Sequence, residues 1–161
     1  MQIAVVGSIN TDISIRVPRM PQRHETVVGS GNFELSHGGK GANQAAAAAA
    51  AGAQVHMVGK IGMDDFGARA VEDLESRGID CRYVQRTADH STGLATILLE
   101  PDGANAITVA PGANAALGAD GRARRRTAAR RVRAWSCCNS RFRWRRCSKP
   151  MRIAQAAVAP W

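Results

Sequence analysis

The charge of this sequence changes abruptly after Leu117, and that change limits which part of the chain can form a packed core. Residues 1–117 contain nine Lys and Arg against twelve Asp and Glu, a balance of −3. Residues 118–161 contain thirteen basic residues and one acidic residue, a balance of +12, so the net charge of +9 arises in the C-terminal stretch. We place a domain boundary between Leu117 and Gly118, and we expect the fold to lie before it.

The segment 118–150 lacks the apolar residues that a fold needs. It contains eleven Arg, and Val132 is its only Val, Ile, Leu or Met. No part of it has the apolar periodicity of a strand or a core helix. Ordering the segment would cost more entropy than its apolar surface could offset, so it is predicted to be disordered.

Residues 1–117 alternate between strand-like and helix-like patterns. The apolar run 3–6 predicts a buried strand, the alanine-rich run 42–51 predicts a helix, and 54–61 is the next strand candidate. Apolar residues at helical spacing then continue as far as Gly78. This order predicts an α/β fold in which helices pack on a parallel sheet.

Three further extended stretches do not belong to that alternation. Apolar and polar residues alternate in 13–17, a second stretch covers 25–35, and two apolar runs within 94–109 surround the turn sequence Pro101-Asp102-Gly103. We expect these three stretches to form a small accessory sheet.

The sequence gives no sign of a membrane protein. No apolar run reaches the roughly 18 residues of a membrane helix. The first residues, MQIAVVGSIN, have neither the basic start nor the cleavage-site pattern of a signal peptide. We therefore expect a cytoplasmic protein without a membrane partner.

Polar residues follow the first strand, and a glycine cluster precedes the first helix. Asn10 and Asp12 come where open α/β sheets bind ligands, beyond the carboxyl end of a strand. A carboxylate with an amide supplies the acceptors and donors that adjacent sugar hydroxyls require. The glycines of Gly-Gly-Lys-Gly-Ala-Asn at 38–43 allow the backbone to approach a ligand closely. Each part alone is also typical of a cap or a tight connection, and Gly41 after Lys40 excludes a P-loop.

Several strings together carry a family resemblance that covers residues 1–117. They are Val-Val-Gly-Ser-Ile-Asn-Thr-Asp at 5–12, Gly-Gly-Lys-Gly-Ala-Asn-Gln-Ala at 38–45, Gly-Lys-Ile-Gly at 59–62 with Asp64 and Asp65, Ser-Thr-Gly at 91–93, and Pro-Gly-Ala-Asn-Ala-Ala-Leu at 111–117. In this combination the sequence closely resembles the ribokinase-like members of the PfkB family of carbohydrate kinases.

The resemblance implies a fold, a reaction and a site. The fold would be a ribokinase-like parallel sheet flanked by helices, with a small β lid that in this family can pair two subunits. The primary hydroxyl of a sugar, D-ribose in the first place, would attack the γ-phosphate of MgATP to give ribose 5-phosphate, with a monovalent cation such as K⁺ assisting. The residues implied to line the sugar pocket are Asn10, Asp12, Gly39, Lys40, Gly41, Ala42 and Asn43.

The catalytic base of the resembling family has no counterpart in these 161 residues. The family carries it as the Asp of Gly-Ala-Gly-Asp, whereas Gly118-Ala119-Asp120-Gly121 has a different order and comes too early. We therefore expect a truncated and inactive form, to which we assign no catalytic residue and no metal ligand. A non-catalytic sugar-binding or subunit-pairing remnant is an alternative.

The segment 118–150 allows three explanations of its own. A basic arm could bind nucleic acid, with Trp135, Phe142 and Trp144 available for stacking, although we do not expect this partner. A metal site formed by Cys137, Cys138 and Cys147 is a second explanation, but these residues lack the usual spacing of metal ligands. We favour a frameshift, because the genetic code permits an overlapping frame here that encodes a family-like strand and helix. Residues 151–161 then resume as a short family-like helix.

Overall fold

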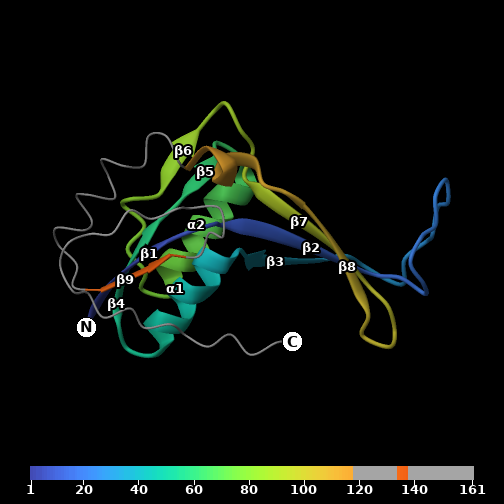
Figure 1. The fold of residues 1–161 in the computed structure, drawn as a ribbon, viewed down its shortest axis with the longest axis horizontal. Coiled ribbons are helices and arrows are strands. Elements are labelled where there is room, and N and C mark those ends of the chain that lie inside the picture. The colour runs from blue at the N-terminus through green and yellow to red at the C-terminus, as the bar shows by residue number, and fades with distance from the viewer. Residues whose placement is uncertain (118–133, 138–161) are drawn as a thin grey trace.

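The computed structural model describes residues 1–117 and the backbone of residues 134–137. Its central sheet is parallel and has three strands in the order β4-β1-β9. The bounds of these strands are β1 Gln2–Val6, β4 Gln54–Val58 and β9 Ala134–Cys137. Two helices, α1 (Lys40–Ala50) and α2 (Asp65–Ser76), lie alongside the sheet (Figure 1). The predicted parallel sheet with packed helices is confirmed for the described part of the chain.

The core lies between this sheet and the two helices. Val5, Val55 and Met57 alternate along β1 and β4 toward the helices, where they meet Ala45 of α1 and Leu74 of α2. All five are almost fully buried. Burial of a side chain such as Val, Leu or Met stabilises the fold by about 1.5–3 kcal/mol relative to exposure, so this layer holds both helices in place.

A second sheet of four strands extends from the core as an arm (Figure 1). Its order is β3-β2-β7-β8, with β2 antiparallel to β3 and parallel to β7. The strand bounds are β2 Asn10–Arg16, β3 Glu34–Gly38, β7 Gly93–Leu99 and β8 Asn105–Ala110. The remaining elements are the paired strands β5 Lys60–Gly62 and β6 Gln85–Thr87 and the 3₁₀ helix η1 Gly112–Leu117. The arm is the accessory sheet that the sequence predicted.

Two predicted strands differ from the structure. The prediction for 25–35 is wrong over 25–33, because β2 ends at Arg16 and β3, its neighbour, begins only at Glu34. The single strand expected at 54–61 is two strands, which are separated at Gly59. The first, β4, belongs to the central sheet, and the second, β5, pairs with β6 in another sheet.

The disorder predicted for 118–150 is wrong for residues 134–137, although this segment lacks the apolar periodicity of a strand. These four residues form β9, which pairs with β1. Pairing at a sheet edge is made by backbone groups and needs no apolar periodicity, which explains why the pattern missed it. The rest of the expected disorder, the frameshift and the helix at 151–161 lie outside the described residues.

Within residues 1–117, no helix has both the length and the apolar character that crossing a membrane requires.

Candidate sugar-binding site

Asn10 and Asp12 lie on one face of β2, at the end of the arm that adjoins the core. Asn10 is in register with Gly38 on one neighbouring strand and with Gly93 on the other. A Cβ atom on Gly38 would lie 2.7 Å from Asp12 Cγ, and one on Gly93 would lie 2.5 Å from Asn10 Oδ1. The two glycines therefore leave the space that the two polar side chains occupy.

The N-terminus of α1 is held against the chain segment that leads into β2. Gly39 has φ 94°, a conformation that favours glycine, and a Cβ there would lie 2.7 Å from Ser8 O. A Cβ on Gly41 would lie 2.6 Å from the carbonyl carbon of Gly7. The Ala42 backbone N–H donates to Ser8 O at 3.1 Å. The glycine cluster thus brings the first helical turn, whose N–H groups have no partner within the helix, beside the start of β2.

One oxygen of the half-buried Asp12 carboxylate lacks a hydrogen-bond donor among the described residues. Its Oδ1 is buried and accepts no hydrogen bond within the described part of the chain. Burial raises the pKa of Asp12, and the nearby His37 lowers it by a smaller amount. An acceptor left unpaired in this way costs free energy unless a ligand supplies a donor. The arrangement suits a ligand with hydroxyl groups.

The predicted site residues are brought together only in part. The backbone of Gly39, Gly41 and Ala42 lies against the segment that leads into Asn10. The side chains of Lys40 and Asn43 are exposed, and among the described residues neither forms a hydrogen bond with Asn10 or Asp12. Asn43 instead lines a cavity of about 250 Å³ between α1, α2 and the end of β3.

Asn114 and Asp64 form hydrogen bonds that fix the segments around the site. The sequence analysis assigned neither residue to the site. Asn114 of η1 binds both Ile9 and Asn10 through its side chain. Asp64, the N-cap of α2, accepts hydrogen bonds from Gly67 N, Thr92 N and Thr92 Oγ1. Both residues stand in strings that carry the family resemblance, but the strings do not indicate which side chain meets which.

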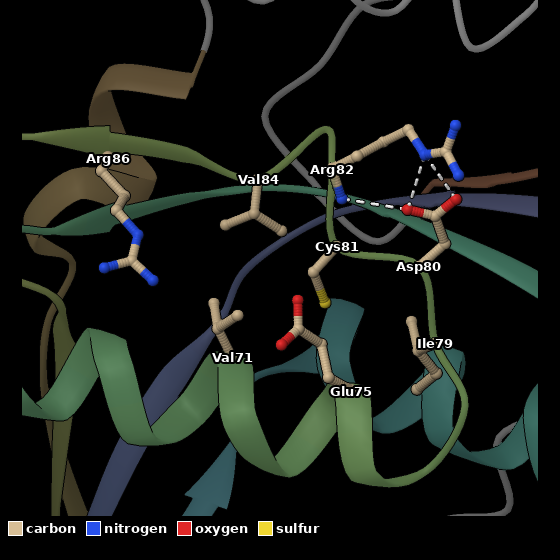
Figure 2. Close-up of a pocket in the computed structure, with 8 residues that line it drawn as sticks. All are labelled: Val71, Glu75, Ile79, Asp80, Cys81, Arg82, Val84 and Arg86. Atoms are coloured by element: carbon tan, nitrogen blue, oxygen red, sulfur yellow. Dashed lines mark hydrogen bonds and ion pairs between the residues drawn. The ribbon is translucent and has the colours of Figure 1, made fainter.

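A larger cavity lies on the other side of α2 and has a different character. Its volume is about 350 Å³. Figure 2 shows Glu75 extending toward Cys81, with Arg86 to one side and the Asp80–Arg82 ion pair to the other. Burial, with the nearby charges of Glu75 and Asp80, raises the pKa of Cys81 to about 12, so the thiol is not a ready nucleophile. No three His, Cys, Asp or Glu side chains converge as a metal site anywhere in residues 1–117.

Known proteins resemble this chain in both sequence and structure. The model of the pfkB family carbohydrate kinases matches residues 1–128, which extends past the boundary predicted after Leu117. The chain is 42% identical over 112 residues to the ribokinase of Bacillus subtilis (strain 168), covering 70% of this chain and 38% of that protein. It is 40% identical over 114 residues to the deoxyribokinase of Salmonella typhi, with coverages of 71% and 37%.

A solved structure extends the likeness to the fold. The ribokinase of Arabidopsis thaliana, complexed with ribose and ATP, aligns with a TM-score of 0.64 and 36% identity over 70% of this chain and 36% of that one. The predicted ribokinase-like α/β fold is therefore confirmed. The chain spans less than two-fifths of the length of each of these three relatives. The family model matches residues 1–128, which is most of this chain, so the chain belongs to the PfkB family of carbohydrate kinases.

Proposed function

We propose that this chain supplies the sugar-binding part of an ATP-dependent sugar kinase, with D-ribose as the preferred sugar. The observation that carries the proposal is the Oδ1 atom of Asp12, which is buried and accepts no hydrogen bond from the described residues, on a face where two glycines leave space. The relatives named ribokinase and deoxyribokinase support a pentose over other polyols. The residues assigned to the pocket remain Asn10, Asp12, Gly39, Lys40, Gly41, Ala42 and Asn43.

In this proposal the chain positions the sugar for phosphoryl transfer. Ionised Asp12 accepts hydrogen bonds from hydroxyl groups, and Asn10 binds a neighbouring hydroxyl. The backbone N–H of Gly41 offers a further donor at the helix N-terminus, whereas that of Ala42 is bonded to Ser8 O. Phosphoryl transfer depends mainly on positioning and on stabilisation of charge, so a rigidly held sugar is the contribution expected of these residues.

ATP, Mg²⁺ and K⁺ belong to this proposal through the family alone. The Arabidopsis relative was solved with ATP, which supports ATP as the phosphate donor. The described residues offer no cluster fit for a metal ion, so no step of the reaction is assigned to a metal held by them. The 161 residues also contain no Gly-Ala-Gly-Asp string to provide the base.

Calorimetry and an ADP-release assay on the purified chain test the proposal together. We expect the chain to bind D-ribose and to release no ribose-dependent ADP, because the base is absent. A titration with a hexose such as D-glucose is the control and should give weaker binding. Absence of ribose binding would remove the proposed substrate, whereas ribose-dependent ADP release would overturn the expected inactivity.

The arm is also proposed to pair two copies of the chain. Leu35 of β3 is 45% exposed, and Ile107 and Val109 of β8 are 55% and 52% exposed. These two strands are the edges of the arm, and apolar exposure at an edge strand favours burial against a partner. Sedimentation equilibrium should detect a dimer that Ile107→Lys converts to a monomer. A monomeric unaltered chain would contradict this pairing.

A cytoplasmic location is proposed with this metabolic role. The nucleic-acid alternative depends on the basic tail 118–150, whose side chains lie outside the described part. Residues 1–117 give it no support, because their net charge is −3.

A further inference from the structure

The side chain of Asn114 joins two distant parts of the chain at the proposed site. Asn114 belongs to η1, yet its Oδ1 accepts a hydrogen bond from Ile9 N at 2.9 Å. Its Nδ2 donates to Ile9 O at 2.9 Å and to Asn10 Oδ1 at 2.9 Å. One carboxamide is therefore bonded three times to the residues that open β2.

These bonds allow only one orientation of the Asn114 amide. The Ile9 N–H is a donor and can meet only the oxygen of Asn114, while Ile9 O is an acceptor and can meet only the nitrogen. Rotating the amide by half a turn would set donor against donor and acceptor against acceptor. The backbone of Ile9 thus fixes which end of the Asn114 amide faces Asn10.

The orientation of Asn114 in turn fixes that of Asn10. Because Asn114 Nδ2 is a donor, the Asn10 atom beside it is the oxygen, which this bond occupies. The Asn10 NH₂ group has no hydrogen-bond partner among the described residues. Toward a ligand, Asn10 therefore acts as a donor.

Asp12 is the complementary partner two positions along the same strand face. An ionised carboxylate is acceptor-only, and Oδ1 of Asp12 is unpaired. A donor and an acceptor side by side match two adjacent hydroxyl groups, of which one accepts from Asn10 and the other donates to Asp12. A sugar that lacks one hydroxyl of the pair leaves a polar group of the site unpaired, which is a strong source of discrimination.

We infer that Asn114 is a positioning residue: it holds Asn10 with its NH₂ group toward the ligand and so makes the site select a sugar with two adjacent hydroxyls. This inference rests on the proposed sugar-binding function and adds how the site distinguishes sugars. In this inference Asn114 acts through its hydrogen bond to Asn10 and makes no contact with the sugar.

The test measures dissociation constants of the 161-residue chain for D-ribose and for 2-deoxy-D-ribose, which lacks one hydroxyl of a neighbouring pair. The unaltered chain should prefer ribose. Asn114→Ala frees the Asn10 amide to rotate, and we expect it to weaken ribose binding about 10-fold while the preference over 2-deoxyribose falls toward one. Asn105→Ala, the same change at an exposed position of β8, should alter neither constant.

A second variant covers the case in which Asn114→Ala does not fold. Asn114→Asp keeps the size of the side chain and the acceptor for Ile9 N–H, but it presents an oxygen to Asn10 and favours the reversed Asn10 amide. It should therefore also reduce the ribose preference. An unchanged preference in the folded variants would overturn the role of Asn114 and leave the proposed function standing. No ribose binding by the unaltered chain would overturn both.

Discussion

Asp12→Asn is expected to make the folded chain more stable and to remove most of its affinity for ribose. The substitution replaces a half-buried carboxylate, whose Oδ1 accepts no hydrogen bond from the described residues, by a neutral amide of nearly the same shape. Relief of the desolvated charge should raise the free energy of unfolding by about 1 kcal/mol at neutral pH. Loss of charge-assisted hydrogen bonds, each about 1.5–3 kcal/mol, should weaken ribose binding by at least about 10-fold.

The pH dependence gives this prediction a second readout. Burial raises the pKa of Asp12 in the folded chain, with His37 opposing the shift. Protonated Asp12 therefore favours the folded state. This contribution to the free energy of unfolding is complete below the ordinary carboxyl pKa, and it is lost as the pH rises through the higher pKa of the folded chain. Urea unfolding from pH 3.5 to 7 should show that loss in the unaltered chain and not in Asp12→Asn. Lower stability of Asp12→Asn at pH 7, or unchanged ribose affinity, would contradict the assigned role.

Asp64→Ala is expected to produce the largest loss of stability. Asp64 caps α2 through Gly67 N at 2.8 Å, and it accepts from Thr92 N at 2.7 Å and Thr92 Oγ1 at 2.6 Å. Thr92 precedes Gly93, over which Asn10 lies, so the same carboxylate holds a wall of the site. Loss of the cap and of two charge-assisted bonds should lower the free energy of unfolding by about 2–4 kcal/mol, measured by urea denaturation.

Asp65→Ala provides the matched control, because Asp65 is the exposed neighbour in the first turn of α2.

The contribution of Asp64 should also depend on pH. Burial raises the pKa of Asp64, but hydrogen bonds from Thr92 and Gly67 outweigh this effect and lower the pKa overall. The stability that Asp64 contributes is thus present above the ordinary carboxyl pKa and is lost as the pH falls through the lower folded value. Equal stability of the two variants at pH 7 would show that Asp64 is not the anchor.

The local patterns of the sequence were sufficient to predict the main elements. Alternating strand and helix patterns gave the parallel sheet with α1 and α2, and the glycine cluster at 38–43 gave the tight turn into α1. Each of these signals is contained in a short window, where periodicity and backbone preference act.

Contacts between distant residues could not be predicted in the same way. Asn114 meets Asn10 across 104 positions, and no local pattern distinguishes it from another turn residue. The pairing of β9 depends on the free edge of β1. The absence of the strand predicted at 25–33 depends on where β2, the neighbour of β3, ends. Tertiary context decided all three.

An NMR titration of the ¹⁵N-labelled chain with D-ribose tests most directly whether the two polar residues of β2 and the glycine turn form a sugar site. We predict that shifted signals cluster at residues 10–12, 38–43 and 93, and that Asp12→Asn abolishes the shifts while the rest of its spectrum is retained. Shifts confined to the cavity around Cys81, or none at ribose concentrations well above the millimolar range, would contradict the account.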